Sequence, residues 1–209
     1  MSFTLLGSPF SVRVQVHRTL HPVRYVAFLR AINVAGHAII KMTDLRDAFE
    51  AAGCRNTTTY IQSGNVIFDM ADGNPEALFQ KIRTKVRGLA GGEPDIVFRT
   101  ARALELLVRA APFKALEGER GLKLYVTFLA QKPRAKPAFP LLLPKDALEA
   151  IGMRGLDVLL VSRPKPNGFY GFPNNFIEKA CGVSGTSRNW TTVTKVLALA
   201  RQDPSGATR

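Results

Sequence analysis

The sequence predicts an α+β protein with a ferredoxin-like (split βαβ) N-terminal half and a second, degenerate α+β half. Three observations lead to this prediction. Apolar runs and amphipathic stripes follow one another in the order β-α-β-β-α-β over residues 24–100. The pentapeptide YVAFL at 25–29 returns as YVTFL at 125–129. The 209 residues, 46% of them hydrophobic, suffice for a core without disulfide support.

The first three strands and the first helix follow from local patterns. A compact run with aromatic and β-branched residues at 24–32 predicts a buried strand. Thr43 is expected to cap an amphipathic helix that Gly53 ends. Two extended runs follow at 55–61 and 65–70. A β-α-β-β order results.

The rest of the first half has clear helix boundaries. Asn74, followed by proline, predicts the start of a helix, and Gly91 predicts its end. Residues 94–100 read as the fourth strand, after which Thr100 is expected to cap another helix that stops before Pro112. These elements complete the split βαβ pattern.

The second half repeats the pattern less regularly. Strands are predicted at 122–130, 157–162 and 168–172. A short helix is expected at 146–151, and two helices close the chain, capped by Asn175 and Ser187. Trp190 begins the apolar stripe of the last helix, and we expect it to anchor that helix.

We therefore expect four segments along the chain. They are a flexible N-terminal extension (1–22), a ferredoxin-like subdomain with an added helix (23–112), a second α+β subdomain ending in two helices (113–203) and a flexible tail (204–209).

The charge balance favours an anionic partner. The chain carries 29 Lys and Arg against 16 Asp and Glu, a net charge of +13 that both halves share. A positive net charge of this size attracts nucleic acid and other polyanions. Alternatively, it is a general surface property that affects solubility alone. The two distant cysteines indicate a reducing compartment, and we expect a cytoplasmic bacterial protein without a signal peptide or membrane span. Oligomeric state is left open.

Standard catalytic and cofactor signatures are absent from the sequence. It contains no GxSxG elbow, Walker loop or GxGxxG fingerprint, and no Cys or His lies at zinc-ligand spacing around His37. We therefore predict no cofactor and no metal, and whether the protein is an enzyme stays open.

Three stretches contain the candidate site residues. Residues 62–65, Gln-Ser-Gly-Asn, have the turn chemistry of a tight β-β connection, although a turn alone does not explain Gln62. The last helix has an N-terminal dipole suited to anions, which Arg188 would strengthen. With the loop after the first strand, the candidate anion- or ligand-binding residues are Arg30, Asn33, Gly36, Gln62, Ser63, Asn65, Ser187, Arg188 and Asn189.

Three longer motifs contain most of these residues. They are FLRAINVAGHAIIKMTDLR at 28–46, TYIQSGNVIF at 59–68 and TSRNWTTVTKVLAL at 186–199. Together the motifs resemble the bacterial domain-of-unknown-function family 1697. The resemblance implies an α+β fold of ferredoxin-like halves, without an activity, catalytic residue or cofactor. Ala31, Ala35 and Thr191 depart from the family pattern.

Three hypotheses of function remain. The first is binding of an anionic ligand, either nucleic acid or a phosphorylated metabolite. The second is an enzyme with an atypical site where Asn33, Ser63, Asn65 and Arg188 converge. The third is a structural or interaction protein whose motifs hold two subdomains together.

Overall fold

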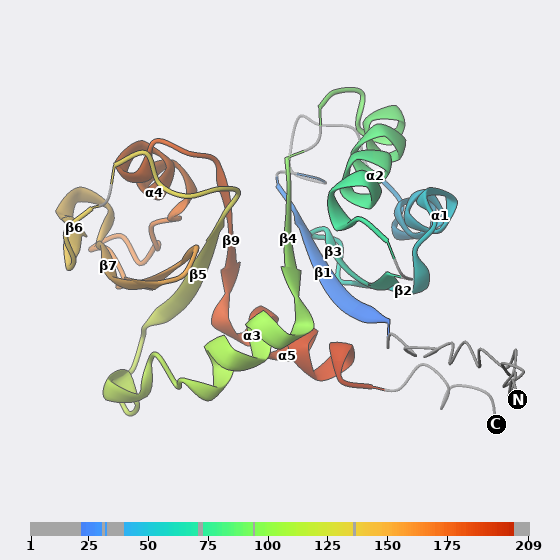
Figure 1. Ribbon diagram of the computed structural model, residues 1–209. Coiled ribbons are helices and arrows are strands. Elements are labelled where there is room, and N and C mark those ends of the chain that lie inside the picture. Colours follow the sequence, from blue (N-terminus) through green and yellow to red (C-terminus); the bar gives the residue numbers. More distant parts are fainter. Residues whose placement is uncertain are drawn as a thin grey trace, which may run out of the picture.

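The computed structural model describes residues 22–30, 32, 40–70, 73–93, 95–135 and 137–202. These residues form a mixed α+β fold with two antiparallel sheets and five α-helices (Figure 1). The first half consists of β1 (Val23–Leu29), α1 (Met42–Ala52), β2 (Arg55–Tyr60), β3 (Asn65–Met70), α2 (Pro75–Ala90), β4 (Ile96–Thr100) and α3 (Ala101–Arg109). The second half consists of β5 (Lys123–Leu129), β6 (Leu141–Leu143), β7 (Leu148–Arg154), β8 (Asp157–Ser162), α4 (Asn174–Cys181), β9 (Gly185–Asn189) and α5 (Trp190–Ala200).

The two sheets share a strand order. The first sheet runs β2-β3-β1-β4, and the second runs β7-β8-β5-β9 with β6 added at its edge. The registers also correspond, because Phe28 pairs with Asn65 in the first sheet and Phe128 pairs with Asp157 in the second. The repeated YVxFL pentapeptide thus occupies the same place in both sheets. Residues that match in this way, such as Phe28 and Phe128, are corresponding residues of the two halves.

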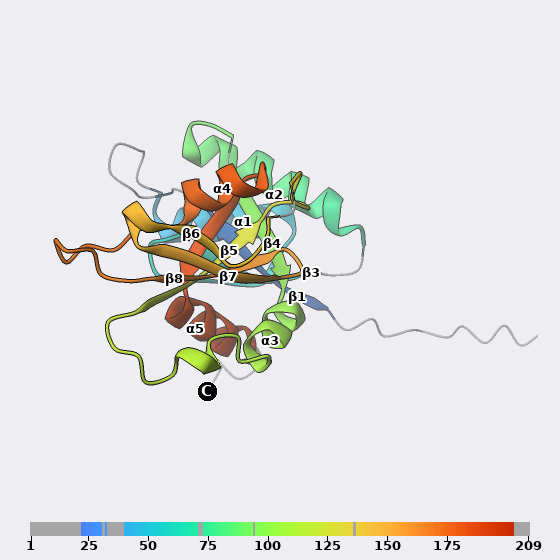
Figure 2. The ribbon, with the colours of Figure 1, turned by 90° about the vertical axis from the view of Figure 1, so that its left-hand side faces the viewer.

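The helices form two layers. Helices α1, α2 and α4 lie on one side of the sheets, and α3 and α5 lie on the other, where the halves meet (Figures 1 and 2). Each half therefore buries one sheet face under its own helices. The other two faces pack against the shared pair α3 and α5.

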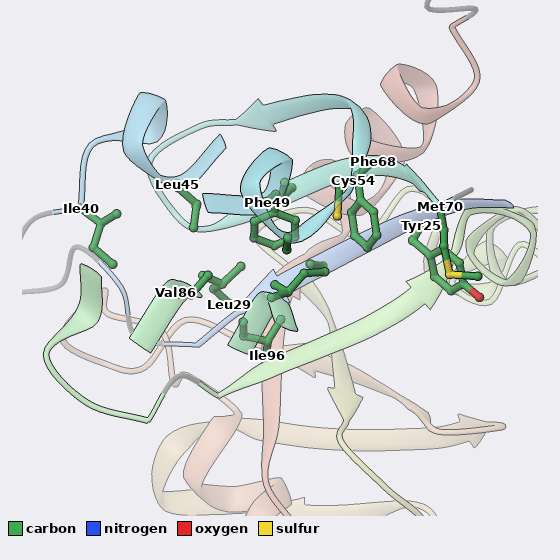
Figure 3. Packing of buried hydrophobic residues seen from close by; sticks show 14 residues of the cluster. Tyr25, Leu29, Ile40, Leu45, Phe49, Cys54, Phe68, Met70, Val86 and Ile96 are labelled. Atoms are coloured by element: carbon green, nitrogen blue, oxygen red, sulfur yellow. The ribbon is translucent and has the colours of Figure 1, made fainter. Parts of the chain in front are cut away.

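The first core lies between β1, β3 and the helices α1 and α2. Phe49 of α1 meets Phe68 of β3 edge to face, with ring centroids 5.4 Å apart, and both side chains are fully buried (Figure 3). Cys54 and Met70 complete this end of the cluster. The spacing of apolar residues along α1 and α2 accounts for this packing.

A second core joins the halves. The rings of Phe28 and Phe128 stack with centroids 4.2 Å apart, so corresponding residues of β1 and β5 touch at the centre of the protein. Val193 and Leu197 of α5 belong to the same cluster as Leu104 of α3. Trp190 packs edge to face on Phe113 at this boundary, with centroids 5.1 Å apart.

Several predicted boundaries are confirmed. The strands predicted at 65–70 and 157–162 are β3 and β8. Asn74 caps α2 by accepting from the Glu76 N–H, and Thr100 caps α3 by accepting from the Ala103 N–H. The first helix differs at its start: Lys41 occupies the N-cap, and Thr43 lies within the first turn.

The predicted helix at 146–151 is wrong. A short 3₁₀ turn (Pro144–Asp146) leads directly into strand β7, which pairs with β6 and β8 on its two sides. Sheet pairing outweighs local helix propensity here. The predicted strand at 168–172 is reduced to a single bridge between Pro164 and Tyr170, in a segment where two prolines remove backbone donors.

Two predicted helix caps in the second half are also wrong. Helix α4 begins two residues earlier than expected, with Pro173 at its N-cap in place of Asn175. Ser187 lies inside strand β9, because the stretch 185–189 extends and pairs with β5. Asn189 caps α5 by accepting from the Thr191 N–H at 2.9 Å.

Candidate functional site

The Gln-Ser-Gly-Asn stretch forms the predicted turn between β2 and β3. Tyr60 pairs with Asn65 across it, and Ile61 and Gly64 take positive φ angles of 48° and 72°. A Cβ at Gly64 would lie 2.7 to 2.9 Å from side-chain atoms of Ile32 and Leu29. Glycine is therefore required there by both backbone conformation and close approach.

Arg188 of β9 reaches across to this turn. Its Nε donates to Asn65 Oδ1 at 2.6 Å, and its Nη2 donates to the Ser63 carbonyl at 2.9 Å and to the Leu29 carbonyl at 2.7 Å. Nη1 donates to Thr186 Oγ1 and to the Ser187 carbonyl. Protein acceptors thus surround the whole guanidinium group.

Burial shapes the chemistry of this cluster. Arg188 is only 8% exposed, and burial lowers its pKa to about 10, so it stays charged at neutral pH. Asn65 is fully buried and donates to the Tyr60 carbonyl and to Ser63 Oγ, both at 3.0 Å. Among the described residues Arg188 has no carboxylate partner, and oriented carbonyl and amide dipoles stabilise its charge.

Arg99 of β4 makes the corresponding contacts from the first half to the second. Its Nε donates to Asp157 Oδ1 at 2.9 Å, and its Nη2 donates to the Leu129 and Leu156 carbonyls at 2.8 and 3.2 Å. Burial raises the pKa of the Asp157 carboxyl, and the Arg99 guanidinium opposes that rise. Each half therefore sends one arginine into the strand ends of the other half.

The stacked phenylalanines lie between the two arginines. The Arg188 guanidinium lies 5.5 Å from the centroid of the Phe28 ring, and that of Arg99 lies 5.6 Å from the centroid of Phe128. Because these rings also stack on each other, the cations and aromatics form one connected unit at the centre of the protein.

The other candidate residues fall in different places. Arg30 forms an ion pair with Glu178 of α4 and another, at 3.5 Å, with Asp95. Gln62 is exposed on the turn, and Ser187 Oγ lies 2.6 Å from Thr127 Oγ1 in the buried second sheet. The predictions for Asn33, Gly36 and His37 fall outside the described residues.

A groove opens between the halves beside Arg99. It has a volume of about 570 Å³ and runs between β4 and α3 on one side and the β7–β8 turn on the other. Its apolar lining residues are Tyr25, Phe79, Phe98, Leu106, Leu107 and Leu156. We call it the junction groove. None of the candidate residues predicted from the sequence lines it.

Two arginines give the junction groove a positive character. Arg154 is exposed and lines it, and the guanidinium of Arg83 lies 5.3 Å from the centroid of the lining ring Phe98. Within the described residues neither arginine forms an ion pair, whereas Arg99 is neutralised by Asp157. The charges around the groove therefore favour an anion.

Sequence reasoning missed Arg99, Asp157 and the junction groove. The repeated YVxFL pentapeptide carried a usable signal: once β1 and β5 correspond, Arg99 and Arg188 occupy matching positions opposite Val26 and Val126. The groove had no such signal, because its walls come from segments that lie far apart in the sequence, around Tyr25, Phe79, 98–107 and 154–157.

Fold and site together define a two-sheet α+β protein with a buried arginine cluster and an open groove at its junction. Among the described residues, no three side chains are grouped to hold a metal ion, and no helix is long and apolar enough to cross a membrane. The model of the family described as "Protein of unknown function (DUF1697)" matches residues 23–158. The chain belongs to that family.

The structural comparison agrees with this fold. A conserved bacterial protein, SP0830 from Streptococcus pneumoniae, superposes with a TM-score of 0.59 over 87% of this chain and 100% of its own. Sequence identity is 16%, so this similarity concerns the fold alone. No functionally curated protein shows significant similarity to the chain.

Proposed function

We propose that this protein binds a small anionic ligand in the junction groove. The observation that supports this most directly is Arg154, an exposed cation without a carboxylate partner among the described residues, on the wall of a largely apolar groove. An apolar body would be buried against the lining, and its charged group would face the arginine. A volume of about 570 Å³ suits a ligand of that size.

The site differs from the one that the sequence suggested. Arg188 already donates to acceptors of its own chain, and Asn189 caps α5, so an added anion would have to displace protein partners there. Among the described residues, Arg154 has no ion-pair or hydrogen-bond partner that an anion in the junction groove would have to displace. The net charge of +13 would favour its approach from any direction.

Nucleic acid is a second candidate partner, favoured by helix α2. Lys81 and Lys85 are exposed one turn apart on this helix, without carboxylate partners among the described residues. A titration of a generic oligonucleotide tests this alternative. The Lys81→Ala/Lys85→Ala double variant should bind the oligonucleotide more weakly than the wild type does. Affinity that is absent even at low salt would exclude nucleic acid.

We also infer that each half is a ferredoxin-like unit, over 23–112 and 113–203, in a cytoplasmic protein. The order β-α-β-β-α-β of the first half and the strand order shared by the sheets support this inference. The enzyme alternative has less support, because Ser63, Asn65 and Arg188 converge in a closed hydrogen-bonded cluster.

The charge of Arg154 provides the test of the proposed function. The probe is 2-naphthylacetate, followed by calorimetry or by the protein's thermal stabilisation. Arg154→Ala should weaken its binding by up to about fivefold, since an exposed charge pair contributes up to about 1 kcal/mol. Arg120→Ala removes an exposed arginine remote from the groove and should leave binding unchanged. Equal affinities of the wild type and Arg154→Ala would refute the proposal.

A further inference from the structure

We infer that the backbone N–H of Phe98 selects the head group of the ligand, and that the ligand is an aryl carboxylate with one oxygen on this N–H. The inference rests on the proposed function of the junction groove and adds the chemical class. It derives from a comparison of the two halves, because the second half shows the corresponding position filled by the chain itself.

The register directs the Phe98 backbone away from β1. The Arg30 N–H donates to the Asp95 carbonyl at 2.8 Å, which fixes the hydrogen-bonded pairs between β1 and β4. Because such pairs alternate along an antiparallel ladder, the pair of Ala27 and Phe98 is not hydrogen-bonded. The Phe98 N–H and carbonyl therefore point to the free edge of β4. The carbonyl accepts from Arg99 Nη1 at 2.9 Å.

Ser187 is the corresponding residue of β9. It faces Thr127 as Phe98 faces Ala27, and its carbonyl accepts from Arg188 Nη1 at 2.9 Å. Its N–H is not open: it donates to Asn174 Oδ1 of helix α4 at 2.8 Å. The Gly185 N–H, two residues earlier, donates to the Glu178 carboxylate at 2.9 Å. Helix α4 thus supplies two oxygen acceptors to the edge of the second sheet.

Helix α2 supplies rings and cations at the same place in the first half. Within the described residues, no acceptor is bound to the Phe98 N–H. The Phe79 ring stacks on the Phe98 ring with centroids 3.9 Å apart, and Arg83 lies beside them. Phe98 lines the junction groove and is half-buried, and β4 is the edge strand of its sheet, so we place its outward N–H on the groove side.

The ligand chemistry follows from these neighbours. A strand-edge N–H that a ligand shields from water requires an oxygen acceptor, as Asn174 provides in the other half. Arg154 and Arg83 favour a negative charge on that acceptor, which makes it a carboxylate. The paired Phe79 and Phe98 rings favour a flat aromatic body beside it. An aryl carboxylate meets all three requirements.

Hydrogen exchange tests the inference on the free protein. The Phe98 amide should exchange roughly tenfold or more faster than the Ser187 amide, because only Ser187 has an acceptor. On saturation with 2-naphthylacetate, the Phe98 amide proton should shift downfield and its exchange should slow. Slow exchange of Phe98 in the free protein, or an unchanged amide resonance at saturation, would overturn the inference.

Removal of the N–H gives the decisive comparison. Replacing Phe98 by phenyllactic acid converts the amide into an ester and keeps the ring. We expect 2-naphthylacetate to bind roughly tenfold or more weakly. Neutral 2-methylnaphthalene, which has no acceptor, should bind both forms equally and so shows that the groove is intact.

The two proposals fail in different ways. If Arg154→Ala weakens 2-naphthylacetate but the ester variant does not, the anion is held by arginine alone; the inference is then wrong and the proposed function stands. If Arg154→Ala has no effect, the proposed function itself fails. If 2-naphthylacetamide binds as tightly as the carboxylate, the edge of β4 prefers a neutral carbonyl such as that of a peptide strand, which also overturns the inference.

Discussion

Replacing Arg188 by alanine should destabilise the protein severely without affecting the junction groove. The side chain is 8% exposed and connects strand β9 to the first sheet through the Leu29 and Ser63 carbonyls and Asn65 Oδ1. None of these three oxygens has another donor among the hydrogen bonds of the described residues. The substitution would therefore leave three acceptors of the first half without a donor at the junction.

The magnitude follows from those acceptors. Each buried polar group that loses its partner costs about 1 to 3 kcal/mol of stability, and three acceptors are affected here. Water that enters the new cavity would form hydrogen bonds with some of them and so reduce the total loss. We expect a loss of about 3 to 5 kcal/mol in the free energy of unfolding. For a chain of 209 residues this corresponds to a lower melting temperature by roughly 10 °C.

The assay is equilibrium unfolding in urea, with Arg120→Ala as the exposed control, which should stay within about 0.5 kcal/mol of the wild type. A double-mutant cycle with Asn65→Ala should show strong coupling, because the two side chains meet at 2.6 Å. A loss below about 1 kcal/mol for Arg188→Ala would refute this account of the buried cluster. Weaker binding of 2-naphthylacetate by a folded Arg188→Ala protein would show that Arg188 serves a ligand.

Two further outcomes follow from the backbone and from burial. Gly64→Ala should cost at least about 2 kcal/mol in unfolding free energy, since it adds a close contact to positive φ. Gly91→Ala, with similar φ but open space around it, should cost about 1 kcal/mol, and equal losses would show that only φ matters. Burial raises the pKa of Cys54 to about 12, so the native state keeps a proton that the unfolded chain releases above its ordinary value of 9.0. Stability should therefore be complete below that value and fall as the pH rises toward 12. Urea unfolding at several alkaline pH values should show that the free energy of unfolding falls less steeply with pH in Cys54→Ala than in the wild type. An identical dependence on pH in both proteins would contradict the raised pKa of Cys54.

Local signals in the sequence predicted the first half well. Strand β3 and helix α2 begin and end where alternation, an N-cap asparagine and a closing glycine place them. Such features act within a few residues, so a sequence pattern records them. The second half was harder, because β7 and β9 are strands through pairing with distant partners. The helix-like composition around β7 and the cap-like Ser187 in β9 do not show which distant strands these segments pair with.

The candidate site shows the same division. The turn at 62–65 could be derived from the chemistry of its own residues, and Arg188 from its place in a motif. In the structure Arg188 donates hydrogen bonds to this turn, so neither is left free for a ligand. This contact depends on how the two sheets are placed, which the sequence pattern does not show. The accessible N–H of Phe98 is more remote still, since it is recognised only by comparison with Ser187. Sequence reasoning therefore identified residues of the buried cluster between the halves but not the junction groove beside it.

The exchange of arginines also sets the size of the unit that can fold. The Nε and Nη2 groups of each strand-end arginine find their acceptors in the other half: Arg99 needs Leu129, Leu156 and Asp157, and Arg188 needs Leu29 and the 62–65 turn. A fragment ending after α3 would carry a guanidinium that keeps only its bond to the Phe98 carbonyl, and it would also lack the arginine that completes its own turn. The two halves, although each has its own sheet and helices, should melt in one cooperative transition, and a protease that cuts between them should release no stable piece.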